Sequence, residues 1–395
     1  MTQTAFASPP RSGTATPFDM SLIQRGARLR RSPFFEATQR AGCRGYTVYN
    51  HMFLPIAYDD LEAEYRALLE RVTLWDVSVE RQVEIAGPDA FALTSLLTPR
   101  DLTACDVGQC RYVLITDENG GIVNDPVLLR LEEDRFWLAL ADSDVLLWAK
   151  ALACQRGLDV TVHEPDVSPL QVQGPRSKAV VQALLGDRVL ELTYYTFLET
   201  ELDGIPLVVT RTGWTGEIGY ELYLRDGTRG VELWDRVMEA GRPHGIAPTG
   251  PSDIRRIEAG ILNYGADMTL ADNPYEVGLG RLVDLDADED FLGKEALRRI
   301  KAEGPTRKLA GIEIDGPRVE FNETRWPVSA RGGPVGHVTS AIHSPRLGKN
   351  IGYAMLPIGL ANLGTRLEVD TPWGRRDATV VKKPFLDPKK EIPKG

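Results

Sequence analysis

The residues with the clearest chemical potential lie in one short stretch, Arg211–Leu224, which combines three glycines, one tryptophan and the two carboxylates Glu217 and Glu221. A carboxylate held on rigid backbone can accept two parallel N–H bonds from a planar guanidine-like group. The pterin edge of a folate is such a group. The stretch therefore predicts a binding site for a ligand of this kind at Glu221, with a hairpin that carries a solvated glutamate as the alternative.

Strands are predicted on both sides of this stretch. The run Ile205–Thr210 is strand-like, and the residues after Gly219 alternate between an apolar face and a face that carries Glu221 and Tyr223. A dinucleotide-binding loop would need a helix that opens on the last glycine, and none is predicted. The glycines at 213, 216 and 219 are therefore expected at turns and close approaches, in a gap beside Glu221.

Other common chemistries find no support in the sequence. The five histidines occur singly, without cysteine partners or a His-x-x-x-His spacing, so we expect no metal site. The four cysteines show no Cys-x-x-Cys spacing and are too few for a disulfide framework, which fits a reducing compartment. A Gly-x-Ser-x-Gly elbow is absent, so a nucleophilic serine is not expected either.

Charge and hydrophobicity narrow the class of protein. The net charge of -10 argues against nucleic-acid binding, which depends on clustered Lys and Arg. No apolar run approaches the roughly 20 residues that span a bilayer, and the start lacks a signal-peptide pattern. We expect a cytoplasmic enzyme that acts on small molecules and binds no membrane. The sequence leaves the oligomeric state open.

The order of predicted elements favours an α+β fold. Residues 1–20 are rich in Ser, Thr and Pro and are expected to form a mobile tail. Residues 21–300 mix strands with helices, such as those predicted over 59–71 and 143–156, and read as two interleaved α+β domains. Residues 305–395 carry short alternating runs, which predict a C-terminal β-barrel with strands near 308–314, 336–342, 351–356, 366–369 and 378–382.

Several motifs, in order along the chain, carry a family resemblance. From about residue 30 to the end the sequence resembles the aminomethyltransferase (glycine-cleavage T-protein) superfamily. The matching segments are Leu97–Asp101, Gly120–Asp125, Val172–Pro175, Arg256–Gly260 with Tyr264, Asn273–Gly278, Phe291–Leu297, Gly336–Ser340 and Ser344–Pro345. Within the superfamily the chain looks most like the tetrahydrofolate-dependent dimethylsulfoniopropionate demethylases, through Arg30–Phe34, Tyr46–Pro55, Trp75–Val77, Glu80–Val83 and Asn124–Pro126.

The resemblance implies an architecture, a cofactor and a set of site residues. It implies a T-protein-like arrangement of two α+β domains and a β-barrel around a central folate channel, with tetrahydrofolate as cofactor. Asp125 matches the second acid of the superfamily's Gly-Gly-x-x-Asp-Asp motif, which faces the reactive folate nitrogen, while Asn124 replaces the first acid and removes one charge. The predicted site is Asp125 for catalysis, Glu221, Tyr264 and Tyr112 for folate, and Trp214, Tyr223 and His51 for the donor.

Aromatic residues favour a cationic methyl donor, because cations without N–H groups are held by aromatic faces. The resemblance therefore implies transfer of a methyl group from a sulfonium to N5 of tetrahydrofolate. This chain departs from the family pattern at two places that bear on the identity of the donor. The demethylases carry a lysine where this chain has Gly216, and Glu217 is expected to add negative charge there. Ser252 stands where the T-protein has an arginine. Demethylation of a methylated amine or betaine, a glycine-cleavage aminomethyltransferase and a non-enzymatic folate-binding iron–sulfur maturation protein remain alternatives.

Overall fold

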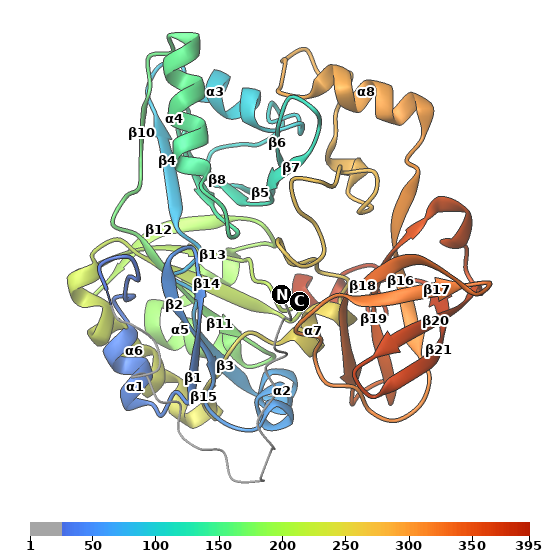
Figure 1. Ribbon diagram of the computed structural model, residues 1–395. Helices are drawn as coiled ribbons and strands as arrows, with labels where there is room; N and C mark the ends of the chain where they lie inside the picture. Colours follow the sequence, from blue (N-terminus) through green and yellow to red (C-terminus); the bar gives the residue numbers. More distant parts are fainter. Residues whose placement is uncertain (1–25) are drawn as a thin grey trace.

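The computed structural model describes residues 26–395 and contains two sheets covered by helices and a separate β-barrel (Figure 1). The predicted mobile tail, residues 1–20, lies outside the described residues. The mixed α+β class and the C-terminal barrel are confirmed. Within residues 26–395 no helix is both long enough and apolar enough to cross a bilayer.

One sheet has five strands, in the order β10-β4-β9-β8-β5. Helices α3 (Ala90–Leu97) and α4 (Val145–Arg156) share an apolar core with it. Helix α4 ends at Arg156, where the sequence predicted its end. Gly157 follows with a φ of 65°, a conformation that glycine adopts readily. The strands are β4 Gln82–Ala86, β5 Cys110–Tyr112, β8 Val127–Glu132, β9 Arg135–Ala139 and β10 Thr161–His163.

The other sheet has six strands, in the order β12-β13-β14-β11-β3-β15. On β14 the predicted alternation is confirmed, since Tyr220, Leu222 and Leu224 enter the core under helices α5 and α6 while Tyr223 faces the five-stranded sheet. The elements are α1 Phe35–Arg40, α2 Leu61–Glu70, β3 Val72–Asp76, β11 Ser168–Gln173, α5 Ser177–Leu185, β12 Phe197–Leu202, β13 Ile205–Thr210, β14 Gly219–Leu224, α6 Gly230–Gly241 and β15 Ile246–Pro248.

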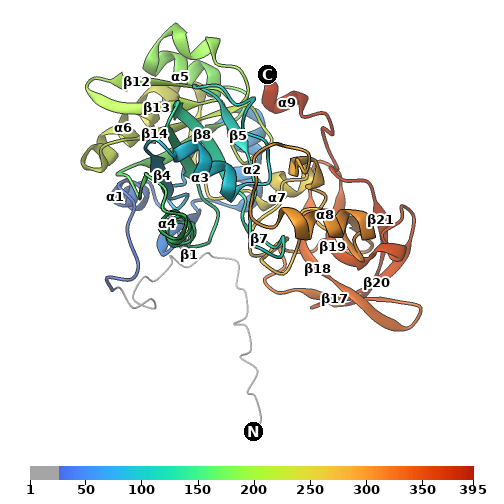
Figure 2. The ribbon, with the colours of Figure 1, turned by 90° about the horizontal axis from the view of Figure 1, so that it is seen from above.

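The chain passes from one sheet to the other, and the two sheets pack against each other. Strand β3 belongs to the six-stranded sheet and β4 to the five-stranded sheet, so residues 77–81 cross between them. An apolar layer joins the sheets, with Cys110 and Trp137 from one and Val208 and Tyr223 from the other. Seen from above, β8 and β5 lie over β13 and β14 (Figure 2). The face of β14 that carries Tyr223 therefore packs against the five-stranded sheet.

The C-terminal unit is a closed barrel in the order β16-β19-β18-β17-β20-β21, in which β16 pairs with both β19 and β21. Closure leaves no free sheet edge. The five predicted strands are confirmed, and the structure adds a sixth, β17. The strands are β16 Arg307–Ile314, β17 Trp326–Ala330, β18 Gly333–Ser344, β19 Lys349–Pro357, β20 Arg366–Thr371 and β21 Gly374–Val381.

Shorter elements connect these units. Helix α7 is the link that matters for the site, because it packs against barrel strand β18 and against the loop before β14. The remaining elements are the hairpins β1 Gly45–Tyr49 with β2 Met52–Ala57 and β6 Ile115–Thr116 with β7 Ile122–Asn124, the helices α7 Asp253–Glu258, α8 Lys294–Glu303 and α9 Glu391–Lys394, and single 3₁₀ turns at Asp187–Glu191, Gly227–Arg229, Arg242–His244, Gly280–Leu282 and Ile358–Leu360.

Candidate active site

Glu221 lies on β14 and is buried among hydrogen-bond donors. Gln171, its partner on β11, donates from Nε2 to Glu221 Oε1 at 2.6 Å. The Tyr223 hydroxyl donates to Oε2 at 3.0 Å, and the Thr212 hydroxyl also donates to Oε2. Burial raises the pKa of Glu221, while these hydrogen bonds oppose the rise. The carboxylate is thus held in place by neutral groups and has no cationic side chain as partner among residues 26–395.

Two oxygens at this position remain open to a ligand. Gln171 Oε1 is buried and has no hydrogen-bond partner, while Glu221 Oε1 accepts from Gln171 alone among the described residues. An sp² oxygen has two lone pairs, so Gln171 and Glu221 together present acceptors for the N–H groups of a planar ligand. Sequence analysis predicted no role for Gln171. The signal that could have found it is the alternation in β11 of Leu170 and Val172 with Gln171 and Gln173, which puts a polar face on a strand that is buried throughout.

Asp125 follows β7 and has a single side-chain partner among the described residues. The Tyr112 hydroxyl, from β5, donates to Asp125 Oδ2 at 2.9 Å, whereas Oδ1 is buried without a partner. Burial raises the pKa of Asp125 to about 7, the Tyr112 hydrogen bond opposes this rise, and the nearby Asp267 adds to it. Asp125 can therefore gain or lose a proton near neutral pH.

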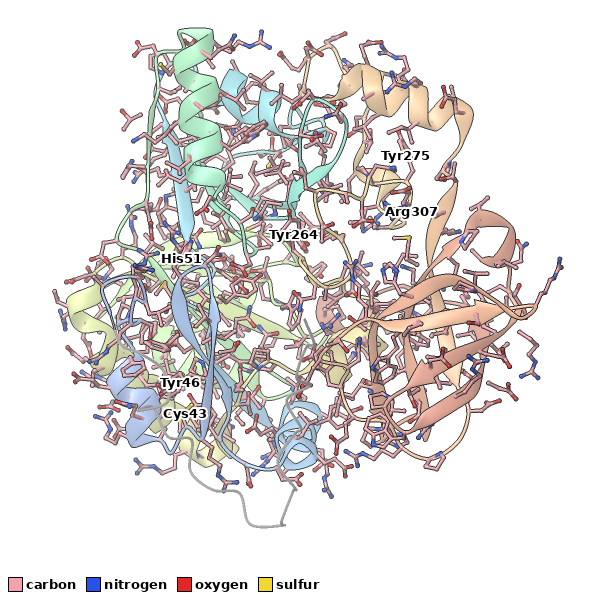
Figure 3. All side chains as sticks on the ribbon, viewed as in Figure 1. Cys43, Tyr46, His51, Tyr264, Tyr275 and Arg307 are labelled. Atoms are coloured by element: carbon pink, nitrogen blue, oxygen red, sulfur yellow. The ribbon has the colours of Figure 1, made fainter. Side chains whose placement is uncertain are left out.

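Asn124 precedes Asp125 in the chain, and the Asp125 charge acts on Tyr264. The Asn124 side chain donates to the Ala141 carbonyl at 3.0 Å and to the Ser143 hydroxyl at 2.7 Å, so it anchors β7 to the loop before α4. The Tyr264 hydroxyl donates to the Ile122 carbonyl at 3.0 Å. Burial and then the Asp125 carboxylate raise the pKa of Tyr264 to about 12. Tyr264 lies near the middle of the molecule (Figure 3).

Glu80 is a further carboxylate at this position, for which the sequence predicted no role. It sits in the turn that crosses between the sheets, and burial and then the carboxylates of Glu221 and Asp125 raise its pKa well above the usual range. The same charges act on Tyr49, whose pKa is raised by burial, by Asp125 and by Glu80. The charges of both Glu221 and Asp125 therefore act on the Glu80 carboxyl group.

Known proteins resemble this chain along nearly its whole length. Residues 34–287 match the model of the GCVT N-terminal domain, and residues 307–387 match that of the glycine cleavage T-protein C-terminal barrel domain. The chain is 42% identical to a dimethylsulfoniopropionate demethylase of Ruegeria pomeroyi, over 91% of this chain and 98% of that protein. It is 35% identical to an aminomethyltransferase of Symbiobacterium thermophilum, over 90% and 97%.

The chain belongs to the glycine-cleavage T-protein family. This family consists of tetrahydrofolate-dependent transferases, and the chain is an enzyme. The fold agrees, because the crystal structure of aminomethyltransferase T from Bartonella henselae superposes with a TM-score of 0.81 at 24% identity, over 90% of this chain and 98% of that one. The exact domain boundaries and the central folate channel stay predictions.

Trp214 and Tyr223 are the two aromatic residues predicted to hold the donor. One face of the Trp214 ring is covered by Arg256. The guanidinium carbon of Arg256 lies 5.5 Å from the centre of the Trp214 ring. Arg256 is buried and ion-paired with Asp253 and Asp267. A donor cation would therefore contact the opposite face of Trp214. Tyr223 is fully buried, with its ring centre 6.3 Å from that of Trp137, and directs its hydroxyl to Glu221.

The structure places His51 away from the other predicted site residues. Its side chain is 64% exposed, and its Nε2 lies 3.7 Å from Oδ1 of the equally exposed Asp144. Figure 3 shows His51 to the left of Tyr264. It occupies the β1–β2 turn with a φ of 61°. Two residues earlier, Tyr49 is the member of this segment that lies close to Asp125 and Glu80. A donor contact by His51 stays a prediction.

The expectation that Glu217 adds charge to the site is wrong. Its carboxylate is buried and accepts from Nε of the fully buried Arg255 at 2.7 Å, so its charge is paired. The glycines are close-approach positions as predicted, although they do not line a gap. A Cβ on Gly213 or on Gly219 would come within 2.3 Å of the Gln173 side chain, which fills the space between them. Ser252 caps α7, its hydroxyl accepting from the Arg255 N–H at 3.3 Å.

Proposed function

We propose that the chain is a tetrahydrofolate-dependent demethylase that transfers a methyl group from a sulfonium donor similar to dimethylsulfoniopropionate to N5 of tetrahydrofolate, giving 5-methyltetrahydrofolate. The observation that carries the proposal is that Asp125 and Glu221 are buried beside tyrosines without an ion pair to any Lys, Arg or His of residues 26–395. Such a site lacks a positive charge, which a cationic donor supplies. The 42% identical demethylase supports the same donor class.

The proposed reaction needs little from the protein beyond alignment and one proton acceptor. A sulfonium leaves as a neutral sulfide, so no acid is required, and the site has only to hold donor and acceptor in line and to exclude water. N5 carries a proton that it must shed once it is methylated. The ionised Asp125 accepts this proton, directly or through a water molecule, and its pKa of about 7 suits the task near neutral pH.

The folate is proposed to bind with its pterin edge on Glu221 and with Tyr264 close by. The Glu221→Gln variant is expected to lose several kcal/mol of tetrahydrofolate binding, because the ligand N–H groups lose a charged acceptor. Calorimetry with tetrahydrofolate measures this loss. Thr228→Ser, on the exposed turn before α6, is the control. An unchanged affinity in Glu221→Gln would remove Glu221 from the folate site.

The proposal is tested by the reaction product. We expect purified protein, tetrahydrofolate and dimethylsulfoniopropionate to give 5-methyltetrahydrofolate by mass, because the methyl group keeps its oxidation level. A panel of methylated amines and betaines separates the alternative donors. Mainly 5,10-methylenetetrahydrofolate, with ammonia released from an aminomethyl donor, would favour a glycine-cleavage aminomethyltransferase, the activity named for the 35% identical relative.

A further inference from the structure

The tail after the last barrel strand, residues 382–395, leaves the barrel and reaches the six-stranded sheet. The N–H groups of Phe385 and Leu386 donate to the Glu258 carbonyl of α7 at 3.0 and 2.9 Å. The Asp387 carboxylate then accepts the first two N–H groups of α9, both at 2.8 Å. Figure 2 shows α9 apart from the barrel strands. The tail therefore connects the barrel to α7 and continues beyond it.

Arg211, directly after β13, binds the far end of this tail. Its Nη2 donates to the carbonyls of Pro393 and Lys394, each at 3.1 Å, and its Nη1 donates to the Gly219 carbonyl at 2.8 Å. The side chain is 2% exposed, and its guanidinium carbon lies 5.1 Å from the centre of the Tyr220 ring. No carboxylate in the described part of the chain pairs with it. This buried cation is therefore held by backbone carbonyls of two separate segments.

The loop between β13 and β14, which Arg211 closes, carries side chains of the proposed folate and donor sites. The Thr212 hydroxyl donates to Glu221 Oε2, and the Thr212 carbonyl accepts from Gln173 Nε2 at 3.2 Å. Trp214, proposed to contact the donor, follows two residues later. Because the Nη1 bond joins the two ends of this loop, a shift of Arg211 moves the Thr212 hydroxyl relative to Glu221.

We propose that Arg211 is a positioning residue for the folate site and that the docked tail holds it in place. The tail fixes the guanidinium, which fixes the loop and the Thr212 hydroxyl against Glu221. Arginine suits this role because its planar guanidinium donates in several fixed directions at once, whereas the lysine ammonium is a point charge. The inference rests on the proposed binding of tetrahydrofolate at Glu221. Tail docking and folate binding then favour each other by the same factor.

The first test measures tetrahydrofolate affinity by calorimetry in the full chain. Arg211→Met removes the donors and is expected to weaken binding by about tenfold. Asp387→Ala, which removes the cap of α9 and loosens the tail, is expected to act in the same direction. The double variant should lose no more than Arg211→Met alone, because both changes break one connection. Arg229→Met, in the exposed turn before α6, is the matched control and should bind normally.

The second test needs only the wild-type protein. If the coupling is about tenfold, tetrahydrofolate should slow hydrogen exchange of the amides of residues 387–395 by about the same factor. Exchange in the turn between β20 and β21 is the internal control and should not change. A purely structural Arg211 would leave exchange in the tail independent of folate. This measurement and Asp387→Ala decide the matter if Arg211→Met does not fold.

The outcomes separate this proposal from the proposed function. Normal tetrahydrofolate affinity in Arg211→Met, additive losses in the double variant, or tail exchange that ignores tetrahydrofolate overturns the positioning role. A wild-type protein that binds tetrahydrofolate but transfers no methyl group contradicts the proposed function, and Arg211 is still judged by affinity and exchange. If the wild type binds no tetrahydrofolate, both proposals fail.

Discussion

Asp125 and Asp267 are neighbouring aspartates that the fold treats differently. Asp267 is 2% exposed and accepts hydrogen bonds at both oxygens. Its Oδ2 accepts from Arg256 Nη1 at 2.8 Å, and its Oδ1 accepts from the hydroxyls of Thr339 at 2.7 Å and Ser340 at 2.6 Å. Asp125 has the Tyr112 hydroxyl on one oxygen and nothing on the other among the described residues.

We expect this difference to separate a structural acid from a reactive one. Asp267 joins α7, through Arg256, to the barrel strand β18, and its interactions are complete within the protein. Asp125 is incomplete, so part of its interaction energy is left for a ligand or a proton.

The largest effect is expected for Asp125→Asn, which keeps the shape of the side chain but cannot accept a proton. Single-turnover methyl transfer should slow by about 10²–10⁴-fold, the usual contribution of a general base. Folate affinity should change little. The folded-state pKa of about 7 lies above the usual 3.8, so the contribution of Asp125 to the free energy of unfolding is fully present below pH 3.8 and is lost as the pH rises through 7.

Because the Asn variant lacks this loss, its melting temperature at pH 7 should not fall below that of the wild type. Thermal melts at pH 4 and pH 7 measure the difference. A wild-type transfer rate in Asp125→Asn would mean that positioning alone is the mechanism, and would strike Asp125 from the catalytic residues. A lower melting temperature with unchanged rate would identify a turn-capping aspartate instead.

Asp267→Asn should have the opposite profile. Removing one partner of a buried ion pair costs about 3–5 kcal/mol of unfolding free energy. Arg256 would keep only Asp253 as its carboxylate partner among the described residues. Denaturant unfolding of Asp267→Asn beside Asp125→Asn makes the comparison direct. Should Asp267→Asn be as stable as the wild type, the division into a structural and a reactive aspartate does not hold.

The smallest effect is expected for Tyr112→Phe, which removes the hydroxyl on Asp125 and little else. The hydrogen bond lowers the pKa of Asp125, so its loss should move that pKa above 7. Since the ionised carboxylate is the active form, the rise of the transfer rate with pH should move to higher pH. Single-turnover rates from pH 5.5 to 9 test this, and an unmoved profile would separate Tyr112 from Asp125 in the reaction.

Residues whose placement depends on local pattern were predictable. The alternation on β14 put Glu221 and Tyr223 on one face, and the barrel strands followed from short alternating runs. Strand β17 was missed because Pro327 cannot donate to a ladder, so the segment does not read as a strand. It is a strand because barrel closure places it between β18 and β20.

The sequence by itself determined the family and the α+β class with its barrel, and it selected Asp125 and Glu221 as candidate site acids, because motifs and periodicity are properties of neighbouring residues. Only the tertiary structure decided which groups meet. Glu221 raises the pKa of Glu80 because the chain crosses between sheets and the sheets pack together. The charge of Glu217 is paired because α7 brings Arg255 beside it. Charge pairing and burial depend on contacts between distant segments, which no local pattern encodes.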